Sequence, residues 1–322
     1  MISRTIKAIA AALTIAALFH VTPGAAAFPE KEITIVVGFS AGGLADTGAR
    51  VWADAASPIL SKRVIVLNKP GAGGVIAVSE VARAAPDGYT LIFFTPGPFV
   101  VQPHFEQLQY EVPDSFVPIL SQYINPIIIA APADAPYSTL KEVVAYAKKN
   151  PGALRYSSSS TRGIERFAME RLQQAAGVKL EIIPFKSSGD ATTALLGKHV
   201  ELTSAYFPDL KTHFDAKTLK PIASLGFDRN DLPVNTIPTA REDGYDVVGV
   251  TYSGLLAPKG TPKEIVDRLH DAFRQAQETA QFKQSMERIG MKVRYMNGKD
   301  FLEQIRRDYE NNGRIIKSLG LK

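Results

Sequence analysis

The stretch ITIVVGFSAGGLAD, residues 33–46, decides how the rest of the chain is interpreted. Residues 33–37 are mostly β-branched and predict a buried strand, and a glycine-bearing loop follows from Gly38 to Gly43. A helical pattern then continues towards Leu60. Glycines let backbone N–H groups approach a ligand, and a helix N-terminus presents unpaired N–H donors with a partial positive charge. The stretch therefore predicts a site for an anion.

The first 27 residues have the organisation of a secretory signal peptide. Arg4 and Lys7 give a basic start, residues 8–19 an apolar core, and residues 25–27, all alanine, a small-residue cleavage site. An uncleaved membrane anchor is the alternative, but the apolar run is too short to be a good membrane span. No cysteine lies near the cleavage site, which excludes a lipoprotein anchor. We therefore expect an exported protein.

The composition of the 322 residues is that of a globular protein, with 45% apolar and 21% charged side chains. The 37 basic and 32 acidic side chains leave a small positive excess, which argues against a nucleic-acid partner. The chain has no cysteine, which excludes disulfides, thiolate catalysis and cysteine-based metal sites. The charge is compatible with an anionic small molecule, and we expect no cofactor.

Two further strand–loop–helix units follow the first one. Residues 64–67 and 90–94 predict buried strands, and each strand ends in a Gly/Pro-rich loop, at residues 68–74 and 95–98. Strands that alternate with helices form parallel sheets, and ligands bind beyond the carboxyl ends of such strands. We therefore expect the three loops to converge on one crevice.

The middle of the chain predicts a second lobe. Residues 116–131 are almost continuously apolar and predict a strand that crosses from one lobe to the other, and residues 247–257 predict the return crossing. Between the crossings, short strands alternate with helices, the first of which begins with a capping box at Ser138 or Thr139.

We therefore expect an α/β protein of two lobes, each with a mainly parallel sheet flanked by helices, joined by two crossing strands. Lobe 1 is discontinuous and comprises residues 28–123 and 249–322, and lobe 2 comprises residues 124–248.

Patterns for catalysis or metal binding are weak. The histidines are isolated, without the paired spacing of metal ligands: His20, His104, His199, His213 and His270. No Gly-x-Ser-x-Gly elbow is present, and nothing identifies a base for the serines at 157–160. The glycines at 38, 42 and 43 do not have the spacing of a dinucleotide fingerprint, and the second strand ends in Asn68 instead of an acid. We expect no metal site and no enzyme, with an exported carboxylate-processing enzyme as a less favoured alternative.

Charged residues in the loops have two interpretations each. Asp46 could order the first loop against a ligand, but we favour a structural cap in the first turn of the helix. Arg162, in the polar loop 157–163, could hold a carboxylate through two parallel hydrogen bonds or be a solvated surface charge, and both interpretations stay open. The same holds for Lys186. The aromatic residues at or near strand ends are interpreted as core or cleft wall: Phe39, Phe185, Tyr206 and Tyr252.

Four motifs together resemble one family of receptors. They are FSAGGLAD at 39–46, NKPGAGG at 68–74, APDGYTL at 85–91 and GLLAPKGTP at 254–262. The chain resembles the Bug receptors, the periplasmic solute-binding components of tripartite tricarboxylate transporters, over essentially the whole mature chain. The resemblance implies a type II periplasmic-binding-protein fold that closes on a ligand between its lobes. It also implies a periplasmic protein whose partner is an integral-membrane permease, and we expect a monomer.

The resemblance further implies where the ligand is held. In this family the first glycine loop and the facing loops of the second lobe grip a ligand carboxylate, often through ordered waters. The predicted ligand-binding residues of lobe 1 are Phe39, Ser40, Ala41, Gly42, Gly43, Asp46, Thr95, Pro96, Gly97 and Tyr252. Those of lobe 2 are Ser158, Ser159, Ser160, Thr161, Arg162, Gly163, Phe185, Lys186, Ser187, Ser188, Ala205 and Tyr206.

Two departures from the family bear on the ligand. The second-lobe loop is commonly richer in Gly, Asn and Ser, whereas here it contains Arg162, which favours a second carboxylate on the ligand. An aromatic–Asp pair often follows the strand at 200–202, but Ser204 and Ala205 stand there, which disfavours an amino group. We therefore expect a dicarboxylate, aliphatic or aromatic, in preference to an amino acid or a neutral amide. A receptor that reports its ligand to a signalling partner is the alternative role.

Overall fold

The computed structural model describes residues 28–159, 163–185 and 187–321, so the predicted signal peptide lies outside the described residues. By its internal contacts the chain divides into residues 1–30 and residues 31–322, and every element below belongs to the second unit. No helix in the described ranges is long and apolar enough to cross a membrane.

The first strands form the parallel part of a sheet. β1 (Ile33–Val37) pairs in parallel with β2 (Val64–Asn68) and with β3 (Thr90–Phe94). Helices α2 (Leu44–Leu60) and α3 (Val75–Ala82) follow β1 and β2, which confirms the strand–loop–helix units expected from the sequence. Short helical turns that the sequence did not predict lie in the loops after β2 and β3: η2 (Ala72–Gly74), η3 (Gly97–Val101) and η4 (Gln102–His104).

The middle of the chain forms a second group of strands and helices. Its strands are β5 (Arg155–Ser158), β6 (Glu181–Pro184), β7 (Leu202–Tyr206) and β8 (Leu219–Ser224), and its helices are α4 (Leu140–Lys149), α5 (Ile164–Ala176), α6 (Ser188–Leu196) and α7 (Phe207–Asp215). The predicted capping box is present at Thr139, whose side chain accepts from the amide of Glu142. α7 was not predicted, although Phe207, Leu210 and Phe214 stand at i, i+3 and i+7 and pack on one hydrophobic cluster.

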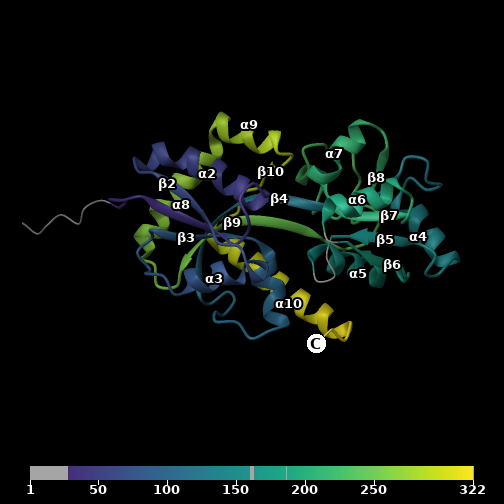
Figure 1. The fold of residues 1–322 in the computed structure, drawn as a ribbon, viewed down its shortest axis with the longest axis horizontal. Coiled ribbons are helices and arrows are strands. Elements are labelled where there is room, and N and C mark those ends of the chain that lie inside the picture. Colours follow the sequence, from purple (N-terminus) through teal and green to yellow (C-terminus); the bar gives the residue numbers. More distant parts are fainter. Residues whose placement is uncertain (1–27, 160–162, 186, 322) are drawn as a thin grey trace, which may run out of the picture. The chain divides into compact units, whose positions relative to one another are not determined.

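Two long strands join these groups, as predicted. β4 (Phe116–Pro132) pairs antiparallel with β9 (Val250–Pro258) over its first part and with β7 and β8 over its last part. Figure 1 shows β4 and β9 running between the two groups of helices. Because β4 pairs in both groups, the described strands form one mixed sheet and not two separate sheets. Its main path is β2-β1-β3-β9-β4-β7-β5-β6, and β8 pairs with β4 beside this path.

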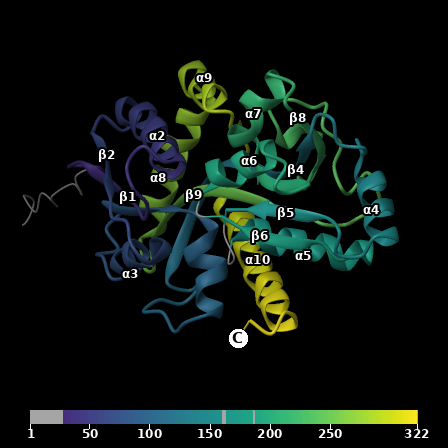
Figure 2. The ribbon, with the colours of Figure 1, turned by 45° about the vertical axis from the view of Figure 1, so that its right-hand side comes forward.

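The last part of the chain returns to the first group. Its helices are α8 (Lys263–Glu278), α9 (Ala280–Arg288) and α10 (Gly298–Ser318). A two-residue strand, β10 (Lys292–Val293), pairs antiparallel with β4, and a short turn, η5 (Arg229–Asp231), precedes β9. Figures 1 and 2 both show α10 passing beside α5.

Aromatic side chains pack both faces of the first part of the sheet. Phe93 and Phe94 are consecutive on β3 and therefore point to opposite faces. Phe93 meets the edge of Trp52 from α2, with ring centroids 6.5 Å apart, while Phe94 stacks on Tyr252 at 5.2 Å. Phe301 of α10 closes that second face at 5.2 Å from Phe94. This packing holds the carboxyl ends of β1 and β3 in place beside the crossing strands.

The names lobe 1 and lobe 2 are kept below for residues 31–123 with 249–321 and for residues 124–248. These boundaries stay a prediction.

Candidate ligand-binding site

Three loops of lobe 1 converge as the sequence predicted. A methyl group built on Gly38 would lie 2.8 Å from the Cα of Gly74, so the loops after β1 and β2 touch backbone to backbone. A methyl group on Gly74 would lie 3.2 Å from Pro98 Cγ and 3.4 Å from Phe39 Cε2, which brings in the loop after β3. Only glycines allow this approach, because any side chain at either position would separate the loops.

A polar network fixes the first loop. The Gly42 amide donates to Asp46 Oδ2 at 2.8 Å, and Arg50 Nε donates to the same oxygen at 3.0 Å. Arg50 also donates to Asn68 Oδ1 at 3.1 Å, and the Asn68 amide donates to the carbonyl of Phe39 at 3.0 Å. Burial alone would raise the pKa of the Asp46 carboxyl, but the bonds from Arg50 and Gly42 outweigh it and lower that pKa. Asp46 therefore has the structural role favoured above, and direct ligand contact by it stays a prediction.

The surface of this loop cluster offers backbone donors. Phe39 is 38% exposed, and Ser40, Ala41, Gly42 and Gly43 are exposed as well. Gly43 is the N-cap of α2, and no described side chain caps the helix there. The first-turn N–H groups of α2 are thus available to an anion. Beside them, Thr95 and Gly97 are half-buried and Pro96 is buried.

The facing loop of lobe 2 is described only in part, since Ser160, Thr161, Arg162 and Lys186 lie outside the described residues. Ser158 is buried, and the half-buried Ser159 donates to Glu165 Oε1 at 3.2 Å. Gly163 is the N-cap of α5, and among the described residues no side chain caps this helix. Among the described residues, this is a second helix N-terminus without a side-chain cap.

The other predicted residues of lobe 2 differ in their surroundings. Ser187 caps α6 by accepting from the Asp190 amide at 3.1 Å, and Ser188 is half-buried next to Asp209. Phe185 is half-buried and packs on the hydrophobic cluster that contains Ala205, which is itself 4% exposed. Ala205 is thus a core residue, and Tyr206, at the end of β7, is the half-buried residue that follows it.

Sequence reasoning missed two acids in this region. Glu165, in the first turn of α5, is 7% exposed and accepts a hydrogen bond from Ser159 Oγ. Burial raises the pKa of the Glu165 carboxyl, whereas Asp209, in the first turn of α7, is exposed. An acid in a first helical turn looks like an ordinary partner of the helix dipole, so no pattern in the sequence distinguished Glu165.

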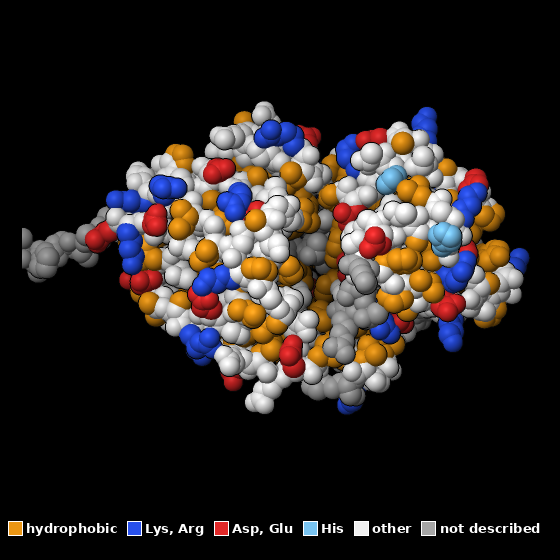
Figure 3. Space-filling view, in the orientation of Figure 1, with side chains coloured by type: hydrophobic (Ala, Val, Ile, Leu, Met, Phe, Trp, Pro, Cys, Tyr) orange, Lys and Arg blue, Asp and Glu red, His pale blue; other side chains and the backbone are white. Residues whose placement is uncertain are grey.

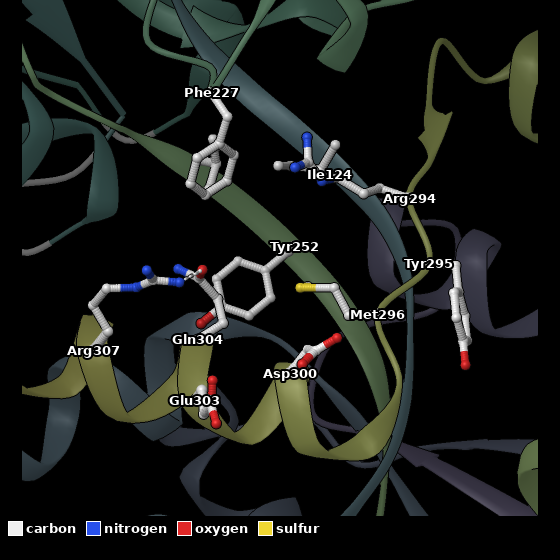
Figure 4. A pocket seen from close by; sticks show the side chains of 11 residues that line it. Ile124, Phe227, Tyr252, Arg294, Tyr295, Met296, Asp300, Glu303, Gln304 and Arg307 are labelled. Carbon is white, nitrogen blue, oxygen red and sulfur yellow. Dashed lines mark hydrogen bonds between the residues drawn. The ribbon is translucent and has the colours of Figure 1, made fainter.

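A hollow of about 330 Å³ lies between the crossing strands and α10 (Figure 4). Figure 4 shows Tyr252 and Phe227 facing it, with Arg294 and Met296 on one side and Gln304 and Arg307 of α10 below. Arg294 forms an ion pair with the buried Asp231 and lies over the Phe227 ring at 4.9 Å. Tyr252 is 1% exposed and lines this hollow, so it belongs to the core and to the hollow.

Two further observations limit the chemistry of the site. Within the described ranges, no group of three His, Asp or Glu side chains is placed to hold a metal ion. The space-filling view shows a groove between the elements of the two lobes, with hydrophobic side chains along it (Figure 3). The arrangement suits holding an organic anion with backbone donors and apolar walls.

Comparison with known proteins identifies relatives along nearly the whole chain. Residues 48–321 match the model of the TctC family, described as the tripartite tricarboxylate transporter family receptor. The UPF0065 protein in the gbd 5′ region of Cupriavidus necator is 36% identical over 296 residues, which cover 91% of this chain and 89% of that protein.

Solved structures with the same fold include receptors with and without ligand. A TctC solute-binding protein from Polaromonas, solved without ligand, superposes with a TM-score of 0.82 at 28% identity and covers 90% of this chain and 99% of its own. A protein of R. palustris solved with adipate has a TM-score of 0.75 at 25% identity, with 91% and 98% covered. MatC from Rhodopseudomonas palustris with bound malate has a TM-score of 0.70 at 26% identity, with 90% and 100% covered. The family is one of receptors and the Polaromonas neighbour is a solute-binding protein, which confirms the expectation that this chain is not an enzyme.

Proposed function

This chain belongs to the tripartite tricarboxylate transporter receptor family, and on that premise we propose that it captures a small dicarboxylate, aliphatic or aromatic, between its two lobes. Its family is periplasmic, and a cleaved signal peptide at residues 1–27 directs this chain to that compartment. The receptor acts as a monomer and delivers its ligand to an integral-membrane permease.

The observation that carries the proposal is the convergence of three loops around the uncapped N-terminus of α2. Gly43 and Leu44 at this N-terminus are exposed, and the first N–H groups of the helix complement one carboxylate. The uncapped N-terminus of α5, at Gly163, supplies a second set of donors from the other lobe. Two sets of donors suit a ligand with a carboxylate at each end, and adipate and malate, bound to two structural neighbours, are ligands of this class.

The preference over an amino acid now has a different basis. The sequence argument relied on the absence of an acid after β7, but Asp209 and the buried Glu165 both lie beside Tyr206. That argument no longer holds. The two helix N-termini and the ligands of the neighbours support a dicarboxylate instead.

Capture works by closure of the lobes around β4 and β9, with the boundaries near residues 123/124 and 248/249. The ligand favours the closed state because only there does it contact both lobes, which supplies the differential affinity that a population shift requires. The permease then recognises the closed surface. Small-angle scattering with and without a bound dicarboxylate tests this step, and an unchanged radius of gyration contradicts it.

Calorimetric titration with malate, adipate, an aromatic dicarboxylate, aspartate and a neutral diamide tests the ligand class. We expect the dicarboxylates to bind and the diamide not to bind. Binding of aspartate with no binding of any dicarboxylate would overturn the proposal. If binding is observed but deletion of the receptor leaves uptake of that ligand intact, the alternative role of a sensor for a signalling partner is favoured.

A matched pair of variants locates the site. Gly42 has φ of +82° and Gly152 has φ of +76°, and a methyl group on either would find no heavy atom within 4 Å. Gly42→Ala and Gly152→Ala therefore carry the same backbone strain, about 1–2 kcal/mol, at different places. We expect similar losses of stability in both, and a loss of affinity of about tenfold or more only in Gly42→Ala, where the loop amides shift. Equal affinities in both variants would place the ligand elsewhere.

A further inference from the structure

Arg294 connects the two lobes beside the crossing strands. It follows β10 in lobe 1, and its guanidinium forms an ion pair with Asp231 of lobe 2. The same guanidinium lies 4.9 Å from the centre of the Phe227 ring, also in lobe 2, and Figure 4 shows its side chain extending past Ile124 towards that ring. Asp231 is 2% exposed, so an arrangement of the lobes that separates this pair leaves a buried carboxylate unpaired, which is costly.

The main chain at Arg294 is fixed to lobe 1. Its amide donates to the carbonyl of Gln122 at 3.1 Å, and its carbonyl accepts from Ser121 Oγ at 2.7 Å. Ser121 also holds Met296, whose amide donates to Ser121 Oγ at 2.7 Å and whose carbonyl accepts from the Ser121 amide at 3.0 Å. The guanidinium of Arg294 can therefore follow a moving partner only by rotation within its own side chain.

The carboxylate of Asp231 is fixed to lobe 2. Its Oδ2 accepts from the amide of Phe227 at 2.6 Å and from the amide of Asp228 at 3.3 Å, while Oδ1 faces Arg294. The loop that carries these residues follows β8 and is tied to β4, because the Leu225 amide donates to the carbonyl of Ile127 at 2.8 Å. Each partner of the ion pair is thus anchored to a different part of β4.

A bulge in β4 lies between the two anchors. Ser121 pairs with Gly254 and Ile124 pairs with Tyr252, so β4 has one residue more than β9 over this stretch. An extra residue of this kind bends and twists the strand that carries it. The bulge lies at the predicted boundary between the lobes, with one anchor before it and the other after it. Rotation of lobe 2 about this place therefore changes the distance between the two anchors.

The ion pair is formed in an arrangement that leaves the loop of the candidate site accessible. Phe39 and residues 40–44 are all exposed. A ligand held between the lobes covers this loop, so capture leads from the described arrangement to a more closed one. The described arrangement is thus open at the first glycine loop.

We propose that Arg294 is a positioning residue whose ion pair with Asp231 holds the lobes in the open arrangement, and that closure on a ligand separates the pair. The inference rests on the proposed function, because it needs closure around β4 and β9. Contacts with the ligand then have to outweigh the ion pair, so the apparent Kd is larger than the Kd of the closed form. Loss of the pair should tighten binding.

Arg294→Met in the full receptor tests the proposal. Titration calorimetry with adipate and malate should show Kd values lower than those of the unchanged receptor by about fivefold or more. Small-angle scattering should show a smaller radius of gyration for the ligand-free variant, and the same radius for both proteins when saturated with ligand. A merely structural role of Arg294 would lower stability without tightening binding, so the direction of the change in Kd distinguishes the two roles.

Three more variants complete the test. Arg241→Met breaks an ion pair with Asp246 that lies within lobe 2, and it should leave both Kd and the radius of gyration unchanged. Asp231→Asn keeps an oxygen that accepts from the Phe227 amide, so it removes the inter-lobe pair from the other side. It should tighten binding as much as Arg294→Met does, and the double variant should gain no more than either single one. Unchanged or weaker binding by both single variants, additive gains in the double variant, or an equal gain in Arg241→Met overturns the proposal.

The outcomes also separate this inference from the proposed function. If the unchanged receptor binds a dicarboxylate and becomes more compact, but Arg294→Met has the same Kd and radius of gyration, the ion pair has no such role and the proposed function stands. If no dicarboxylate binds, the proposed function fails. The scattering of ligand-free Arg294→Met then still decides the role of the pair, because an unchanged radius of gyration refutes it.

Discussion

Replacement of Gly38 by alanine tests whether contact between the first two loops builds the site. The added Cβ would lie 2.8 Å from the Cα of Gly74, 3.1 Å from its carbonyl oxygen and 3.4 Å from its carbonyl carbon. Carbon atoms rest about 3.5–4.0 Å apart, so the loops must separate by about 0.7 Å or more. All three neighbouring atoms are backbone atoms, so no side-chain rotation relieves the clash.

Overpacking of this kind costs about 1–3 kcal/mol. For a unit of this size, that corresponds to a decrease in Tm of about 2–5 °C. Because the loops carry the donors of the predicted site, we also expect dicarboxylate affinity to fall by about tenfold or more, the value of one hydrogen bond to a charged group. Differential scanning calorimetry and titration calorimetry measure the two effects.

Gly97→Ala is the matched control. Its Cβ would come no closer than 4.0 Å to the carbonyl oxygen of Gly73, so the same substitution fits in the same loop cluster without displacement. We expect its Tm to change by less than about 1 °C. The reasoning is refuted if the two variants lose the same stability, or if a crystal structure of Gly38→Ala shows the loops unmoved.

Three further substitutions test other parts of the structure. Arg294→Met leaves the buried carboxylate of Asp231 without its ion pair, so urea unfolding should show a decrease of about 1–3 kcal/mol in the free energy of unfolding. Arg241→Met breaks an exposed ion pair and should change that free energy by less than about 1 kcal/mol. Glu165→Gln should raise the Tm of the free receptor at alkaline pH. Because burial raises the pKa of Glu165 in the folded state, the stability contributed by its protonated form is lost as pH rises through that folded pKa. The gain in Tm should therefore shrink towards acidic pH, and a constant difference would contradict it. Thr139→Ala removes the side-chain oxygen of the capping box and should cost about 1 kcal/mol in the same urea assay, with no change in ligand affinity.

The order of strands and helices followed from local patterns in the sequence. The β-branched run at 33–37, the helix from Leu44 to Leu60 and the crossing strand from residue 116 all appear as predicted. Their signals are periodicity, capping residues and glycine-rich turns, each contained within a few neighbouring residues. Short elements such as η3 gave no such signal, because a five-residue segment has too few positions to show a period.

Contacts between distant segments were decided by tertiary structure alone. The approach of Gly38 to Gly74, the continuation of β4 through both halves of the sheet and the burial of Glu165 beside Tyr206 each depend on how separate elements pair and pack. Tertiary structure also decided that Ala205 and Tyr252 are core residues, because a residue at a strand end faces either the core or the cleft according to what packs on it.

The sequence by itself therefore determined the two-lobed α/β organisation and the family, and it predicted the glycine loop as an anion-binding element. Those conclusions depend on residue types and on spacing along the chain. Only the tertiary structure decided which loops meet that glycine loop and that Glu165 is buried next to Ser159. The reason is physical: a carboxyl group is buried or exposed, and charged or neutral, according to neighbours that sequence distance does not reveal.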